Sequence, residues 1–340
     1  MKLLQAMAGS RHGGAEAFFV RLAVALQRAG LEQRLLVRHE HERSAALRRA
    51  GIEFLELPFG GWLDLVTRYR FRESIASYRP QVVLTWMNRA TALCPKGHFV
   101  HVARLGGYYD LKYYRGCDYL VCNTQDIVEY VVGKGWPRDR AIHLPNFAVQ
   151  EKASPVPRAA FTTPEDAPLA LALGRLHENK GFDVLLEALA QVPGLYLWLA
   201  GDGPLRIELE RRAKDLGVAS RLQLLGWRTD TAALLAAADF LVCPSRHEPL
   251  GNVVLEAWAA GVPVLATASE GPRALIAAEQ TGLLVPVGDS DALAAAMRRL
   301  AADRALRLRL SESGNTAFED QFSEAKVVPL YRDFLERVTH

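Results

Sequence analysis

The sequence has little of what marks several common classes of protein. It holds four cysteines (Cys94, Cys117, Cys122 and Cys243) without a C-x-x-C pair or zinc-site spacing, which favours free, mostly buried thiols in a reducing compartment. No apolar run approaches the roughly 20 residues of a membrane span, and the first residues are too short and polar for a signal peptide. The formal net charge is only +3, so no nucleic-acid partner is indicated. These features predict a cytoplasmic protein that is soluble or lies on a membrane surface.

Short apolar segments alternate with longer amphipathic ones along the chain, which is the pattern of a parallel α/β sheet. The 340 residues are enough for two domains at roughly 150 residues each. The expected strands are 2–6, 34–37, 82–85, 98–103 and 119–122, then 169–173, 196–200, 222–225, 240–243, 262–266 and 283–285. A helix over 15–29 is expected to end at Gly30. The fold class is therefore α/β, with two Rossmann-like domains facing each other across a cleft.

Prolines set the predicted domain boundaries. Pro155, Pro157, Pro164 and Pro168 interrupt any periodicity between the two alternating halves. We therefore expect an N-terminal domain over 1–150, a linker over 151–168 and a C-terminal domain over 169–322. A final helix is expected over 323–340, and it could pack back on the N-terminal domain.

The segment from Ser245 to Pro263 is the most informative one. It follows a predicted strand, and a helix is expected to begin near Gly251 and Asn252. Backbone N–H groups at a helix start lack internal partners and favour negative charge, so this start is a ready phosphate site. Glu248 on the loop and Glu256 one turn inside the helix could bracket a polyhydroxylated ligand there. Taken alone, each glutamate would more simply be a solvated surface residue.

A second candidate site follows the strand over 169–173. Arg175 and Lys180 lie five residues apart on a loop just before a helix. A departing phosphate group gains negative charge as its bond breaks, and fixed cations aimed at it stabilise the transition state more than the ground state. A single loop cation would be read as a surface charge, but this pair favours the functional interpretation.

These segments together resemble the family 4 glycosyltransferases of the GT-B fold (glycosyl transferases group 1). Glu248 and Glu256 stand at the spacing of that family's E-x7-E signature. The stretches 174–181 (GRLHENKG), 201–204 (GDGP), 255–264 (LEAWAAGVPV) and 282–286 (GLLVP) match further elements in the expected order. The resemblance covers most of residues 169–290, and the combination is specific where any one match would be weak.

The resemblance implies roles for individual residues. Glu248, Arg175 and Lys180 would carry catalysis, with the two cations on the diphosphate and Glu248 on the donor sugar hydroxyls. Glu256 would hold the ribose hydroxyls. The donor site would be completed by a set of loop and helix-start residues: Gly13, Gly14, Gly201, Gly203, Leu250, Gly251, Asn252 and Val253.

Gly13 and Gly14 join the first strand to its helix, where paired glycines permit close approach of a ligand. A simple tight turn is the other interpretation. Gly201 and Gly203 could suggest a dinucleotide fingerprint, but Arg206 occupies the third glycine position, which argues against NAD.

The segment 102–114 has four tyrosines within seven residues. Aromatic faces with hydroxyl tips suit sugar rings, so Arg104, Tyr108, Tyr109 and Asp110 are the acceptor-site candidates, with a structural loop as the alternative. His98 and His101 lie on a predicted strand at a spacing that points them to opposite faces, which is poor metal geometry. Whether either has a catalytic role stays open.

Two features depart from the family pattern. Pro249 stands where members commonly have glycine, and residues 269–273 (SEGPR) replace a Gly-Gly pair with a following acid. The second loop would face the sugar, so it bears on donor identity.

The predicted function is a retaining, metal-independent hexosyltransferase. Its donor would be a UDP-sugar, preferred over GDP-mannose, and its acceptor a glycan or lipid-linked glycan, as in lipopolysaccharide or capsule synthesis. No cofactor is expected. The alternatives are a nucleotide-sugar epimerase or phosphorylase of the same fold and a non-catalytic sugar-nucleotide-binding protein. The segment 62–72 combines apolar residues with Arg68, Arg70 and Arg72, which fits peripheral contact with the cytoplasmic membrane face. The other interpretation is an ordinary solvated helix packed on the sheet.

Overall fold

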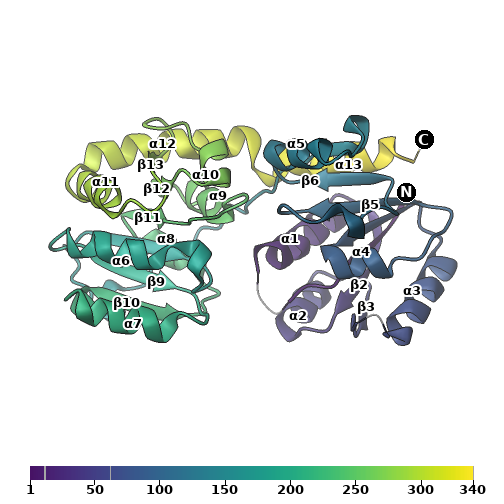
Figure 1. Cartoon of the computed structure of the whole chain (residues 1–340), viewed down its shortest axis with the longest axis horizontal. Helices are drawn as coiled ribbons and strands as arrows, with labels where there is room; N and C mark the ends of the chain where they lie inside the picture. The colour runs from purple at the N-terminus through teal and green to yellow at the C-terminus, as the bar shows by residue number, and fades with distance from the viewer. Residues whose placement is uncertain (11–12, 62, 340) are drawn as a thin grey trace. The chain divides into compact units, whose positions relative to one another are not determined.

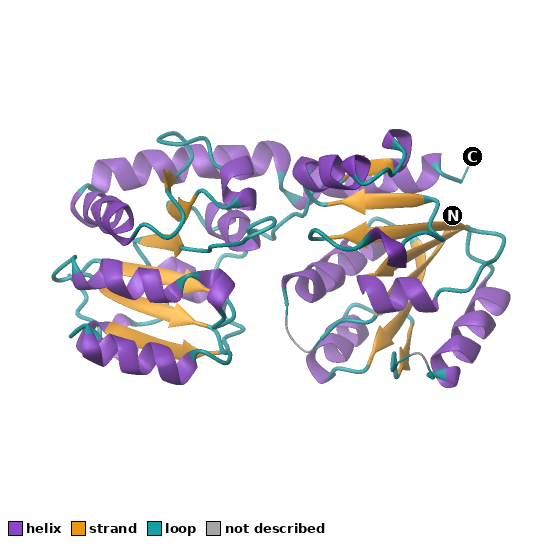
Figure 2. Ribbon diagram, in the orientation of Figure 1, coloured by secondary structure: helices purple, strands orange, loops and turns teal. Residues whose placement is uncertain are grey.

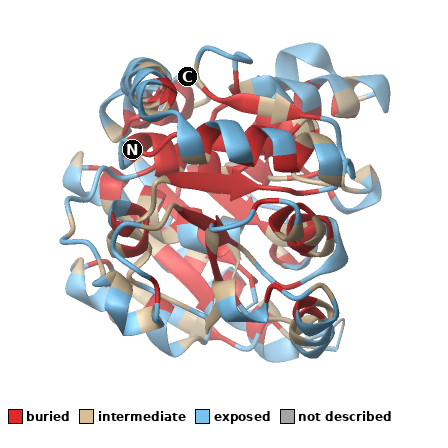
Figure 3. Cartoon of the chain, turned by 90° about the vertical axis from the view of Figure 1, so that its left-hand side faces the viewer, coloured by how far each residue is buried: buried red, intermediate tan, exposed pale blue. Residues whose placement is uncertain are grey.

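The computed structural model describes residues 1–10, 13–61 and 63–339. The chain divides into two compact units, one of Met1–Phe147 with Glu324–His340 and one of Ala148–Ser323. Each unit is a parallel sheet with helices on both faces (Figures 1 and 2). Parallel sheets covered in this way have strands that are apolar on both sides, and Figure 3 shows most strand segments as buried.

The sheet of the first unit has the order β3-β2-β1-β4-β5-β6-β7. Its strands are β1 (Lys2–Met7), β2 (Glu32–Arg38), β3 (Phe54–Leu57), β4 (Val82–Trp86), β5 (Val100–Leu105), β6 (Tyr119–Cys122) and β7 (Ala141–His143). Its helices are α1 (Gly14–Arg28), α2 (His41–Arg49), α3 (Leu65–Tyr78), α4 (Met87–Leu93), α5 (Gln125–Gly133) and α13 (Glu324–Arg337), with short 3₁₀ turns η1 (Leu111–Tyr113) and η2 (Arg138–Arg140).

The sheet of the second unit has the order β10-β9-β8-β11-β12-β13. Its strands are β8 (Leu169–Leu173), β9 (Tyr196–Ala200), β10 (Leu222–Gly226), β11 (Phe240–Cys243), β12 (Val264–Thr267) and β13 (Leu283–Val285). Its helices are α6 (Phe182–Ala190), α7 (Arg206–Asp215), α8 (Thr231–Ala237), α9 (Asn252–Ala259), α10 (Glu270–Leu275), α11 (Ser290–Ala302) and α12 (Arg304–Gln321), with 3₁₀ turns η3 (Arg158–Phe161), η4 (Glu178–Lys180) and η5 (Ala219–Arg221).

The C-terminal helix α13 belongs to the core of the first unit. Its residues Tyr331 and Phe334 are buried in the same apolar cluster as Phe18 of α1. Arg104 is also buried there, with its guanidinium over the rings of Phe18 and Trp86 at 4.7 and 4.6 Å. The helix therefore completes the apolar cover of one face of this sheet.

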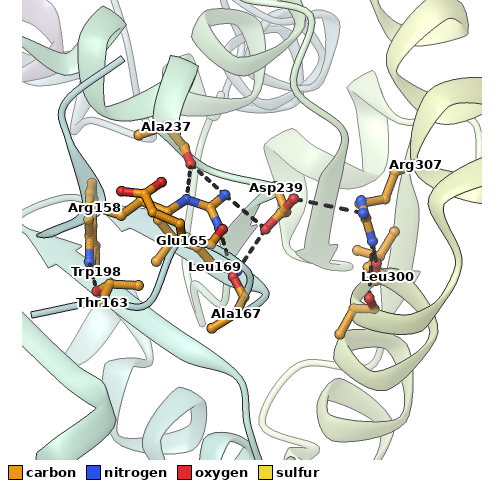
Figure 4. A network of polar contacts seen from close by, with 11 residues as sticks. Arg158, Thr163, Glu165, Ala167, Leu169, Trp198, Ala237, Asp239, Leu300 and Arg307 are labelled. Carbon is orange, nitrogen blue, oxygen red and sulfur yellow. Dashed lines mark hydrogen bonds and ion pairs between the residues drawn. The ribbon is translucent and has the colours of Figure 1, made fainter.

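The predicted linker over 151–168 packs on the second unit instead of standing apart from it. Arg158 donates to the carbonyl oxygen of Ala237 at 2.9 Å and forms an ion pair with Asp239 at 3.1 Å (Figure 4). Asp239 also accepts from the backbone N–H of Leu169 at 2.8 Å, at the start of β8. Thr163 accepts from the indole N–H of the buried Trp198 at 2.9 Å. The prolines therefore mark an irregular segment that is anchored by side chains.

The expected strand over 98–103 begins two residues later, at Val100, which separates the two histidines of that segment. His98 is exposed, whereas His101 is buried. The Nε2 atom of His101 lies 3.0 Å from Thr85 Oγ1, and its backbone N–H donates to Asp118 at 2.8 Å. Burial lowers the pKa of His101 to about 4, against the opposing effects of the Gly116 backbone and Asp118.

This histidine predicts a pH-dependent stability. The unfolded chain protonates His101 near its ordinary pKa of 6.5, but the folded chain only near 4. Its contribution is therefore present above pH 6.5 and is lost as the pH falls towards 4, by roughly 3 kcal/mol in free energy of unfolding. Urea unfolding between pH 7 and 4 should show wild type losing stability more steeply than His101→Gln. His98→Gln, at an exposed site, should follow wild type; parallel curves for all three proteins would contradict the assignment.

Candidate functional site

The strand order of the second sheet reverses between β8 and β11, which are adjacent and parallel. The loops 174–181 and 244–251 follow these strands at their carboxyl ends, and the helices after the two loops pack on opposite faces of the sheet. Open parallel sheets bind ligands in the crevice outside the carboxyl ends of the strands at such a reversal. The two loops carry the three residues predicted to be catalytic, Arg175, Lys180 and Glu248.

Lys180 and Glu248 form an ion pair between these two loops. Their side chains are 25% and 13% exposed, and Ser245 Oγ donates to the same Glu248 oxygen at 3.3 Å. Burial lowers the pKa of Lys180, but the charge and the hydrogen bond of Glu248, together with the Cys243 side chain, raise it by more, so the pKa lies above its ordinary value. An ammonium group has three donors, so Lys180 can hold Glu248 and still offer N–H groups to a bound anion.

The backbones of the two loops are joined next to this pair. The carbonyl oxygen of Asn179 accepts from the backbone N–H groups of Arg246 and His247 at 2.8 and 3.1 Å. Arg246 holds Asp183 of α6 with two hydrogen bonds of 2.6 Å. Gly181 has φ 63°, and a Cβ there would overlap the carbonyl oxygen of Pro244. The ion pair is therefore carried on two loops that cannot move independently.

Gly201 and Gly203, predicted to bind the donor, have a packing function in the structure. Their φ angles are 155° and 159°, and a Cβ would overlap the backbone of Gly174 and of Leu176 respectively. They let the loop after β9 lie against the loop after β8. Arg175 lies on that supported loop, is exposed, and has no ion-pair partner among the residues that the structure describes.

The predicted anion site at the start of α9 has the expected local geometry. Gly251 precedes the helix with φ 86°, and the helix has no side-chain cap. Its first N–H groups are thus not covered by a capping side chain. Leu250 is buried, whereas Asn252 and Val253 are half-buried. Glu256 lies four residues after Asn252 and therefore on the same helix face.

Glu270 was not among the predicted site residues. One of its carboxylate oxygens lies 2.9 Å from His247 Nδ1, and the other accepts from the backbone N–H of Glu248 at 3.3 Å. Gly271 donates to the carbonyl oxygen of Glu248 at 2.7 Å. Burial raises the pKa of Glu270, but hydrogen bonds from its own backbone N–H, from His247 and from the backbone N–H of Glu248, together with the charge of His247, lower it by more, so the pKa lies below its ordinary value. The only signal in the sequence was the departure from the family pattern over 269–273.

In the first unit, Gly13 and Gly14 lie at the start of α1. The Glu16 side chain folds back over this turn and accepts from the backbone N–H and the hydroxyl of Ser10 at 2.7 and 2.9 Å. A Cβ at Gly13 would overlap that carboxylate. Arg11 and His12 of the same predicted loop lie outside the described residues. A cavity of about 360 Å³ adjoins the turn and is lined by Ala8, Gly9, Ser10, Glu16, Arg38, Met87, Asn88, Arg89 and Tyr109.

The four acceptor candidates do not lie together. Arg104 is 3% exposed and hydrogen-bonds Asn146, so the core contacts account for it without an acceptor. Tyr109 lines the cavity beside Glu16. Tyr108 and Asp110 line a different groove, described below. The tyrosine-rich segment therefore serves two surfaces and part of the core.

Over residues 1–10, 13–61 and 63–339, no three His, Cys, Asp or Glu side chains are grouped so that they could hold a metal ion. Within the same ranges no helix has the length and apolar character needed to cross a membrane.

Comparison with known proteins gives consistent matches. The family described as glycosyl transferases group 1 matches residues 167–303. The lipopolysaccharide core biosynthesis glycosyltransferase LpsE of Rhizobium meliloti is 40% identical over 334 residues, covering 96% of both chains. LpsD of the same organism is 37% identical over 345 residues, covering 99% of this chain and 98% of the relative.

Among solved structures, Anabaena Alr3699/HepE in complex with UDP and glucose superposes with a TM-score of 0.88 at 20% identity, covering 99% of this chain and 100% of the other. WaaG, a glycosyltransferase involved in lipopolysaccharide biosynthesis, superposes with a TM-score of 0.78 at 19% identity, covering 98% and 99%. These two likenesses establish the fold.

Proposed function

Because this chain belongs to the glycosyl transferases group 1 family and is a glycosyltransferase of the GT-B fold, we propose that it transfers a sugar from a UDP-sugar to a glycan or lipid-linked glycan. The transfer is a step of lipopolysaccharide core synthesis and retains the configuration at the anomeric carbon. The observation that carries the proposal is the Lys180–Glu248 pair at the strand reversal, beside the start of α9. The names of the two Rhizobium relatives support the pathway. The complex of Alr3699/HepE with UDP supports a uridine nucleotide as a ligand that this fold accommodates.

In this proposal the second unit binds the donor. Lys180, Arg175 and the start of α9 face the diphosphate, whose charge grows as the bond to the sugar breaks. Glu248 accepts hydrogen bonds from the donor sugar hydroxyls, and Glu256 from the ribose. Glu270 and Gly271 fix the backbone on both sides of Glu248, which fixes the direction of its carboxylate.

Retention follows from transfer on one face of the sugar. The bond from the anomeric carbon to the diphosphate oxygen breaks, and a bond to the acceptor hydroxyl oxygen forms on the same face. The acceptor proton passes to the departing phosphate oxygen. This route needs no nucleophilic side chain, and the protein supplies positioning and positive charge.

A surface on the first unit supports peripheral membrane contact at the cytoplasmic face. Four apolar side chains are exposed just before α3 and in its first turns: Leu63, Leu65, Val66 and Tyr69. The most exposed of them is Leu65, at 74%. Arg68 and Arg72 flank this patch, as does Arg70, which pairs with Glu73 at 2.7 Å. Trp62, part of the same prediction, lies outside the described residues. Apolar side chains with flanking cations fit an anionic lipid surface.

The first test separates the two signature carboxylates. Glu248→Gln, whose amide oxygen can still accept from Lys180, should lower turnover by roughly 10²–10³ while leaving the affinity for free UDP nearly unchanged, an effect sized like the loss of one preorganised group. Glu256→Ala should weaken UDP itself. Turnover and UDP calorimetry decide, with Glu312→Ala on the exposed face of α12 as the control for handling and folding. An equal loss of UDP affinity in both variants would sink the division of roles.

The second test concerns the metal. Because cations of the protein face the diphosphate, turnover should persist in excess EDTA. Lys180→Ala should lower turnover more than donor affinity, because the charge develops in the transition state. Arg175→Lys should lower turnover about tenfold, since an ammonium cannot reproduce a planar two-pronged contact with phosphate oxygens. Complete loss in EDTA with recovery on adding magnesium or manganese would show that the charge assignment is wrong.

The third test is flotation with vesicles. Wild type should float with vesicles rich in anionic lipid at low salt and less so at high salt, because screening weakens the attraction. Leu65→Ser with Val66→Ser should reduce flotation several-fold. The matched control is Ile207→Ser, which removes an apolar side chain that is 81% exposed on α7. Equal flotation of both variants, or none of the wild type, counts against membrane contact through α3.

A further inference from the structure

A groove on the first unit, distinct from the donor site, combines aromatic rings with cations. It has a volume of about 650 Å³ and lies between the segment 108–115 and the end of α5. Its walls include Tyr108, Tyr130 and Trp136, together with Lys112, Arg115 and Lys134. Ligand pockets typically measure about 300–1,000 Å³, so this groove has room for a sugar-sized ligand.

The three rings are held in place by hydrogen bonds at their polar ends. Tyr108 donates to Asp126 at 2.5 Å, and Tyr130 donates to the carbonyl oxygen of Tyr109 at 3.2 Å. The indole N–H of Trp136 donates to the carbonyl oxygen of Arg140 at 3.1 Å. The rings of Tyr108 and Tyr130 meet edge to face, with centroids 5.3 Å apart. Each ring is half-buried, so part of its surface stays available.

The local sequence explains how Trp136 reaches the groove. Gly135 follows α5 with φ 91°, and its N–H donates to the carbonyl oxygen of Val132. The N–H of Trp136 donates to the carbonyl oxygen of Val131 at 3.0 Å. This is the glycine-dependent helix ending that turns the next residue back along the helix. It brings the indole beside Lys134 and the tyrosines.

The charges in the groove are predominantly positive. Lys112 is paired with Asp110 at 2.9 Å, the one carboxylate of the lining. Within the part of the chain that the structure describes, Arg115 and Lys134 are exposed and have no ion-pair partner. Lys134 lies over the ring of Tyr130, 5.8 Å from its centroid. Two cations are therefore available to a ligand beside a rigid aromatic wall.

From this arrangement we propose that the groove binds an acidic saccharide, a sugar that carries phosphate or carboxylate. The apolar C–H face of a sugar ring matches the amphipathic rings, and the anionic substituent matches Arg115 and Lys134. Calling this saccharide part of the acceptor rests on the proposed function. The binding itself does not, because every residue of the groove lies outside the donor site.

Direct binding to the full chain tests the proposal. The probes are phosphorylated pentamannose, neutral pentamannose and tri-galacturonic acid, measured by calorimetry at low and moderate salt. Wild type should bind at least one anionic probe about tenfold more tightly than the neutral one, and salt should reduce the difference. Whether phosphate or carboxylate is preferred identifies the anionic group. Equal affinity for all three probes, or no binding at millimolar concentration, would overturn the proposal.

Two variants separate the charges from the rings. Arg115→Gln with Lys134→Gln should abolish the preference for the anionic probe, whereas Arg49→Gln with Lys326→Gln, an exposed pair outside the groove, should keep it. Trp136→Ala should weaken all three probes, provided that its urea unfolding shows a folded protein. The charge variant changes only exposed side chains, so it keeps the test decisive if the tryptophan variant fails to fold. An unchanged preference in the charge variant would contradict the proposal.

Further measurements separate this proposal from its alternatives. Loss of vesicle flotation in the charge variant, with unchanged saccharide binding, would make the groove a lipid contact instead. UDP release from UDP-sugars without acceptor reports on the donor site alone. A wild type that binds the anionic probe but turns over no UDP-sugar would refute the proposed function and leave the groove standing. In a working transfer assay, the charge variant should raise KM for the acceptor and leave KM for the donor unchanged.

Discussion

The ion pair between Lys180 and Glu248 is the contact on which the proposed donor site depends. Each partner alone would be a largely buried, uncompensated charge, which is destabilising by several kcal/mol. The pair forms because β8 and β11 are neighbours where the strand order reverses, so that residues 68 positions apart meet at the carboxyl ends of these two strands. Gly181 follows from the same constraint, because a Cβ there would overlap the carbonyl oxygen of Pro244 on the other loop.

The first unit depends on a second contact that is remote in sequence. Arg104 stacks on Phe18 and Trp86 and bonds Asn146, while Tyr331 of α13 lies against Phe18 in the same cluster. A buried guanidinium needs its hydrogen bonds and its aromatic neighbours together. Residues after 323 are thus part of the unit that begins the chain, although the second unit intervenes in sequence.

The strands whose residues form a short apolar run could be predicted from the sequence. The strands β8, β9, β11 and β13 have the predicted bounds, because buried parallel strands read as short apolar runs. The strands β3 and β7 were missed because they are short and lie at the sheet edges, with only partial burial. The sequence placed Arg104 in the acceptor site and gave Glu270 no role, because the contacts of both residues arise from tertiary neighbours. Likewise the proline spacing indicated a linker, but the contacts of Arg158 across the fold decide its packing.

The sites proposed in the two units are built in different ways. Around Glu248 the loops meet backbone to backbone, so a side chain at Gly181 or Gly271 would displace them. The family model matches residues 167–303, which lie wholly within the second unit. In the first unit the groove is lined by the exposed Arg115 and the half-buried Trp136, neither of which lies in the core of the sheet. If the groove binds a saccharide as proposed, substitution there would change which saccharide is bound without disturbing the sheet or the Lys180–Glu248 pair.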